Sequence, residues 1–73
     1  MIDDNDQKEI IAQNPHGMTV VVHVKYGSDI VLLDRTVVIY DRETQMYTVS
    51  RRDGPPDEFP KENHSISFPE KEK

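Results

Sequence analysis

Histidines could bind a metal ion and serines could act as nucleophiles in this chain. The candidates are His16, His23 and His64 and Ser28, Ser50, Ser65 and Ser67. The histidines lack the spacing of metal ligands and no cysteine assists them, while the serines lack a nucleophile elbow or an oxyanion-hole motif. The carboxylate pair Asp57-Glu58 stands in a Pro-rich segment that fixes no distance between acids. The sequence therefore predicts no catalytic residue, no metal site and no cofactor, and it predicts that the protein is not an enzyme.

Arginine and tyrosine side chains offer binding chemistry instead. The candidate partner-binding residues are Tyr26, Arg42, Tyr47, Arg51 and Arg52, which could form a basic-aromatic patch at a sheet edge. Such a patch suits a protein-protein hot spot or stacking on single-stranded nucleic acid. Edge arginines also simply prevent aggregation between sheet edges. Because the net charge is −5, protein contact is favoured over contact with polyphosphate.

Composition limits the chain to one small domain. It has 73 residues, no Cys and 34% hydrophobic residues, so one core is near the lower size limit. All four arginines lie between residues 10 and 56, whereas residues 1–9 and 57–73 each carry more acids than bases. No apolar run approaches the length that spans a membrane, and the acidic N-terminus is unlike a signal peptide. A neutral, Arg-bearing body with two acidic ends follows.

Local patterns predict a helix followed by three strands. Residues 4–13 suit a short helix, since Asp4 and Gln7 have capping-box spacing and Asn14-Pro15 ends it. Alternating apolar residues predict a strand over 18–26, with further strands over 30–40 and 46–51. Turns are expected at 27–29 and 41–45, and a bulge or bend at Asp34-Arg35.

These elements predict an α+β fold. A short N-terminal helix packs on a small three-stranded antiparallel sheet, and a flexible Pro-rich charged tail follows. Residues 1–52 would form the single folded domain and residues 53–73 the tail, because Pro60 and Pro69 disfavour a strand ladder. A brief fourth strand or a hydrophobic anchor is the alternative for residues 65–68. The expected core comprises Val20, Val22, Val24, Val38, Val49 and, from the helix, Ile10.

Open sheet edges are the most general functional feature that this fold implies. A three-stranded sheet exposes both edges unless the helix or the tail covers them. A partner segment can then bind by adding a strand, and its burial would supplement a marginal core.

The whole chain resembles the small RNA-polymerase-binding transcription regulators of lytic Xanthomonas bacteriophages. The resemblance lies in the 73-residue length, the acidic opening 1–7, the Val-rich strand 19–24 and the Pro-rich charged tail. It implies a protein that binds host RNA polymerase, inhibits initiation by displacing sigma factor and promotes antitermination. It further implies contact with the N-terminal region of the β′ subunit and with the β flap near the RNA exit channel. On this reading the protein acts as a monomer in the cytoplasm of the infected host, and nascent RNA within the complex is the only nucleic acid that it could contact.

Two other functions stay open at this point. One is a small SH3- or OB-like module that binds single-stranded nucleic acid, which requires the strands to close on themselves. The other is an acidic DNA mimic that blocks a DNA-binding host protein, which requires acids along one face of the folded body.

Overall fold

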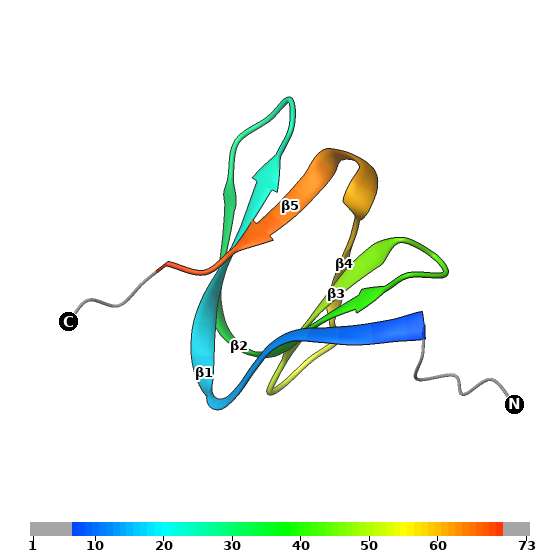
Figure 1. Cartoon of the computed structure of the whole chain (residues 1–73). Coiled ribbons are helices and arrows are strands. Elements are labelled where there is room, and N and C mark those ends of the chain that lie inside the picture. Colours follow the sequence, from blue (N-terminus) through cyan, green and yellow to red (C-terminus); the bar gives the residue numbers. More distant parts are fainter. Residues whose placement is uncertain (1–6, 70–73) are drawn as a thin grey trace, which may run out of the picture.

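The computed structural model describes residues 7–69 as one curled antiparallel sheet of five strands (Figure 1). The strands are β1 (Lys8–Val24), β2 (Ile30–Asp41), β3 (Met46–Arg51), β4 (Asp57–Pro60) and β5 (His64–Ser67), with a 3-10 turn η2 (Lys61–Asn63) before β5. Their order in the sheet is β4-β3-β2-β1-β5, which curls into a half-barrel. No helix within residues 7–69 is long and apolar enough to cross a membrane.

The predicted N-terminal helix is wrong, and the fold is all-β rather than α+β. Residues 8–13 form the first part of β1 and pair with β2, placing Lys8 opposite Asp41 and Ile10 opposite Ile39. The start of the predicted helix, residues 4–6, lies outside the described residues. A short segment with few apolar residues gains too little from a helix. Pairing with the long β2 strand satisfies its backbone instead.

The expectation of a tail without regular pairing from residue 53 is also corrected. β4 pairs with β3 and β5 pairs with the second half of β1, so the sheet extends into residues 57–67. Pro60 is tolerated because β4 is an edge strand, where the missing N–H faces away from the ladder. Residues 70–73 lie outside the described part of the chain.

A shared bend in β1 and β2 produces the curl. Gly17 has φ +103° and Asp34 has φ 57°, both in the left-handed region. Gly17 suits this position because φ +103° strains any residue with a side chain, and because a Cβ atom would lie 2.5 Å from Asp34 Oδ1 and displace that side chain. Arg52 Nη2 donates to Asp34 Oδ1 (2.9 Å) and to the His16 carbonyl oxygen (3.1 Å), which ties both bent strands to the end of β3. The interruption predicted at Asp34-Arg35 is confirmed as this bend, where the strand register shifts.

The core on the concave side of the sheet is small. Val20, Val22, Val38 and Val49 are fully buried, as predicted, and Met18, Leu32, Phe59 and Ile66 pack against them. Val24 is only partly buried, and Ile10 is 60% exposed, so neither belongs to the central cluster. Ile10 is exposed because residues 8–13 form a strand at one sheet edge instead of a helix lying over the valines.

Replacing Val22 by Ala should lower the free energy of unfolding by about 1–3 kcal/mol, since a fully buried side chain loses two methyl groups. Thermal and chemical unfolding followed by circular dichroism measures this change. The matched control is Val31→Ala, because Val31 is 58% exposed on the neighbouring strand. Equal losses in the two variants would contradict the assignment of the core.

Asp41 holds the turn between β2 and β3. Its Oδ1 accepts a hydrogen bond from the backbone N–H of Glu43 (2.9 Å), and Lys8 Nζ lies 3.3 Å from its Oδ2. Burial alone would raise the pKa of Asp41, but the Glu43 N–H and the Lys8 ammonium outweigh it. The pKa of Asp41 is therefore lowered from its ordinary value of 3.8.

Because folding lowers this pKa, the charged Asp41 stabilises the fold at neutral pH, and that contribution disappears as pH falls through the folded-state pKa. Asp41→Asn keeps an acceptor for the turn but removes the charge. Its melting temperature should lie below that of the native protein at about pH 7 and should equal it near about pH 2. A thermal unfolding series across pH measures the difference, with Asp53→Asn as the control. A difference that does not change with pH would contradict this role of Asp41.

Candidate functional site

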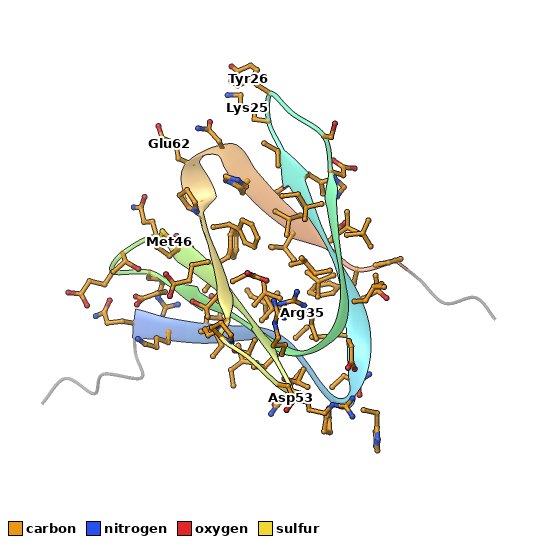
Figure 2. All side chains as sticks on the ribbon, turned by 180° about the vertical axis from the view of Figure 1, so that it is seen from behind. Lys25, Tyr26, Arg35, Met46, Asp53 and Glu62 are labelled. Carbon is orange, nitrogen blue, oxygen red and sulfur yellow. The ribbon has the colours of Figure 1, made fainter. Side chains whose placement is uncertain are left out.

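Four of the five predicted partner-binding residues lie at three separate corners of the half-barrel. Tyr26 is at the tip of the β1–β2 hairpin, Arg42 is in the turn next to Met46, and Arg51 and Arg52 adjoin Asp53 (Figure 2). Tyr47 lies within β3 and is partly buried. Arg51 and Arg52 are neighbours in the chain, but Arg51 contacts Asp57 and Arg52 contacts Asp34.

The predicted arginines are engaged by carboxylates of the fold itself. Arg42 Nη1 lies 3.6 Å from Glu9 Oε1, and Arg52 Nη2 lies 2.9 Å from Asp34 Oδ1. Tyr47 packs against Tyr40 with ring centroids 5.1 Å apart. Of the five predicted residues, Tyr26 is the most open, with 86% of its surface exposed. The arginines and Tyr47 thus contribute to the fold whether or not they also contact a partner.

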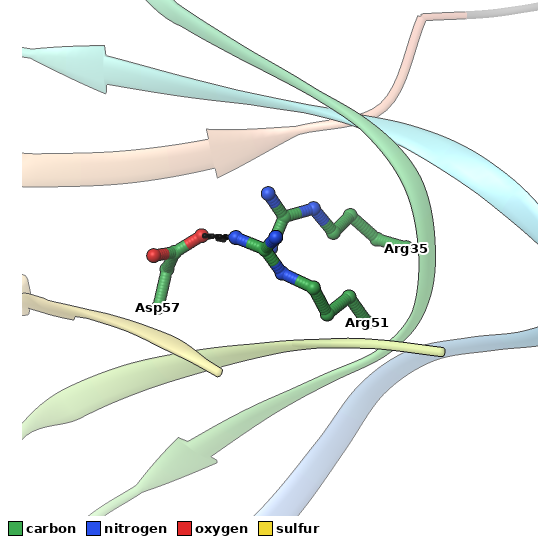
Figure 3. A network of polar contacts seen from close by, with 3 residues as sticks. All are labelled: Arg35, Arg51 and Asp57. Carbon is green, nitrogen blue, oxygen red and sulfur yellow. Dashed lines mark hydrogen bonds and ion pairs between the residues drawn. The ribbon is translucent and has the colours of Figure 1, made fainter. Parts of the chain in front are cut away.

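A charged cluster that the sequence did not reveal lies on the concave side of the sheet (Figure 3). Arg35 and Arg51 are directly opposite one another on β2 and β3. Asp57 Oδ2 accepts from Arg35 Nη1 at 2.7 Å and from Arg51 Nη2 at 3.4 Å. Arg35 is only 6% exposed, and its Nε has no hydrogen-bond partner.

Asp57 gives this cluster its stability. Like charges directly opposite one another on paired strands repel, and a buried guanidinium is costly without an anion. Asp57 supplies that anion from β4, which joins the edge strand to β2 and β3 through one shared carboxylate. The cluster therefore explains why residues after Pro56 return to the sheet.

Asp57→Asn preserves the size of the side chain but leaves two opposed arginines without a negative charge. We expect the free energy of unfolding to fall by about 1–3 kcal/mol. This loss is smaller than that for breaking a fully buried ion pair, because the Asp57 side chain is 37% exposed. Chemical unfolding measures this change. Glu58→Gln, at the exposed neighbouring position, is the matched control, and similar losses in both variants would refute the role given to Asp57.

A serine, a histidine and an aspartate form a chain of polar contacts on the outer face of the sheet. His23 Nε2 lies 2.6 Å from Ser67 Oγ, and His23 Nδ1 lies 3.1 Å from Asp29 Oδ1. These are the contacts of a nucleophile, a base and an orienting acid. The His23 and Asp29 side chains are, however, 41% and 54% exposed, whereas electrostatic catalysis depends on a water-excluded site. We interpret the chain as a tie between β5 and the β1–β2 hairpin.

Two shallow hollows mark the surface. One, of about 280 Å³, is lined by residues 23–25 and 61–65, where Lys25 N–H donates to the Asn63 carbonyl oxygen (2.9 Å). The other, of about 230 Å³, is lined by residues 33–35 and 51–53. Within residues 7–69, no three His, Asp or Glu side chains gather in a way that could hold a metal ion.

Exposed apolar side chains instead concentrate on the β1–β2 hairpin. Its exposed fractions are 86% at Tyr26, 37% at Ile30, 58% at Val31 and 66% at Leu33. We call these four residues the hairpin surface. The sequence prediction of binding residues includes Tyr26 but not the other three. The signal was present in Ile30-Val31-Leu32-Leu33, since four successive apolar residues place apolar side chains on both faces of a strand.

The chain was compared with protein-family models, with curated proteins and with solved structures, and none of them matches it.

Proposed function

We propose that this chain is a non-enzymatic regulator that binds host bacterial RNA polymerase. It inhibits initiation by displacing sigma factor and promotes antitermination through contacts with the β′ N-terminal region and the β flap. It acts in the cytoplasm of the infected cell. The partner and the regulatory outcome rest on the resemblance to phage transcription regulators, and the binding surface rests on the structure.

The observation that carries the proposal is the hairpin surface. Tyr26, Val31 and Leu33 are each more than half exposed and lie on one hairpin of a very small protein. Several exposed apolar side chains on one structural element typically mark an interaction site. Burial of this surface against a partner would also add apolar contact to a core with only four fully buried valines.

Charge favours a protein partner over nucleic acid. Arg35, Arg42, Arg51 and Arg52 each lie within 4 Å of a carboxylate in ion pairs of the fold, so their charge is already partly compensated. With a net charge of −5 the chain repels polyphosphate and is attracted to basic protein surfaces.

A second candidate is the small nucleic-acid-binding module. The half-barrel curl supports it, because SH3- and OB-type domains require strands that close toward a barrel. The ion pairs between the arginines and carboxylates of the fold weigh against it. Because of these ion pairs, charge reversal at Arg51 and Arg52 would disturb the fold as well as any contact with nucleic acid, so it is a poor test of binding. The DNA mimic ranks third, because Glu9, Asp34 and Asp57 form ion pairs with arginines.

Affinity capture tests the proposal. The tagged protein is incubated with bacterial lysate at moderate salt, and the bound proteins are identified by mass spectrometry. Purified polymerase core and holoenzyme then give the affinity and the extent of sigma release.

The double variant Tyr26→Ala/Leu33→Ala should weaken polymerase binding at least about tenfold, since exposed aromatic and aliphatic anchors dominate interfaces.

The matched control is Ile10→Ala/Ile11→Ala, which removes two apolar side chains that are 60% and 40% exposed on the other half of β1. It should bind polymerase as the native chain does. Failure of the native protein to capture polymerase would overturn the regulator proposal. Capture of single-stranded RNA with a steep salt dependence would establish the second candidate instead.

A further inference from the structure

The half-barrel has four open strand edges within residues 7–69. β4 and β5 end the strand order, and the bend leaves one further open stretch in each of β1 and β2. β2 pairs with β1 over residues 30–32, whereas its pairing with β3 starts only at Arg35. The side of Ile30–Leu33 that faces away from β1 therefore carries no neighbouring strand.

Three of these edges are blunted against pairing with another chain. β4 has four residues and ends in Pro60, and β5 also has four residues and is followed by Pro69. The open stretch of β1 begins with Lys8 and Glu9, which form ion pairs with the β2–β3 turn. Short strands, proline and charge are the usual protections of an edge.

The edge at Ile30–Leu33 is as short as β4 and β5, but it contains no proline and no charged residue. All four residues are apolar, and Val31 and Leu33 are 58% and 66% exposed. Successive residues of a strand direct their backbone N–H and C=O groups to alternate sides. This edge thus combines unpaired backbone groups with apolar side chains on both faces, which is what an added strand requires.

Charge at the two ends of the edge identifies the kind of occupant. Asp29 and Asp34 flank it, and their side chains remain 54% and 64% exposed although they contact His23 and Arg52. A second copy pairing antiparallel over the four apolar residues would place Asp29 opposite Asp34 at both ends, and like charges directly opposite destabilise a sheet. A segment with a basic residue at each end would have complementary charge.

We propose that Ile30–Leu33 binds an extended protein segment by strand addition, and that this segment has about four β-forming residues between two basic ones. This inference rests on the proposed function and specifies how the regulator engages its partner. Backbone hydrogen bonds supply the pairing, the hairpin surface supplies apolar contact, and Asp29 and Asp34 select the flanking charges.

A peptide titration of the full chain, labelled with nitrogen-15, tests the inference. The probe is a six-residue peptide with alternating Val and Thr between two lysines, and the comparison peptide has two glutamates at the ends. The lysine peptide should bind at least about tenfold more tightly. It should also slow amide hydrogen exchange within residues 30–33. Equal binding of both peptides, or protection centred on another edge, would overturn the inference.

Two variants complete the test. Leu33→Lys adds a protective charge to this edge and should weaken peptide binding, whereas Ile10→Lys, at a similarly exposed position of β1, should not.

Concentration-dependent self-association that protects the same amides would show a second copy as the occupant and would refute the inference. Polymerase capture that Leu33→Lys leaves unchanged would refute strand addition but keep the proposed function. Peptide binding without polymerase capture by the native chain would refute the proposed function alone.

Discussion

The bend shared by β1 and β2 is the constraint on which the rest of the structure depends. Gly17 and Asp34 take left-handed conformations at adjacent points of the two strands, and Arg52 donates to both strands there. Because both long strands turn together, each contributes to two parts of the sheet. Four valines from three strands then meet on the concave side, so residues 7–69 acquire a core without an α-helix.

The charged side chains inside the half-barrel hold the curled strands together and do not form a catalytic site. Arg35 is almost fully buried opposite Arg51, an arrangement that is tolerable only because β4 carries Asp57 to both guanidinium groups. The arginines that suggest a binding patch in the sequence thus hold strands together: Arg52 at the bend, Arg51 at the concave cluster and Arg42 beside Glu9. A small domain with little apolar core gains strand-to-strand connections in this way.

The same bend creates the surface available for binding. It separates the first part of β2 from β3, so Ile30–Leu33 has a strand on one side only. Val31 and Leu33 are left exposed on the same hairpin that carries the exposed Tyr26. The proposed regulator would act by occupying a surface of its partner enzyme, provided that it binds one state of that enzyme more tightly than another. Only four side chains of the core within residues 7–69 are fully buried, all of them valines, and a bound partner would add stability by mass action.

The sequence alone determined the features that depend on neighbouring residues. Alternation and turn residues located β2 and β3 closely, marked the interruption at Asp34-Arg35 and identified Val20, Val22, Val38 and Val49 as core. Only the tertiary structure decided that residues 8–13 form a strand, that residues 57–67 return to the sheet, and that the arginines pair with carboxylates. Each of these depends on a partner far away in the chain: Ile39 for Ile10, Val49 and Arg35 for Asp57, Asp34 for Arg52. Local propensity cannot encode such pairing, because a segment with weak preference adopts the conformation that satisfies its backbone against whichever strand the fold brings beside it.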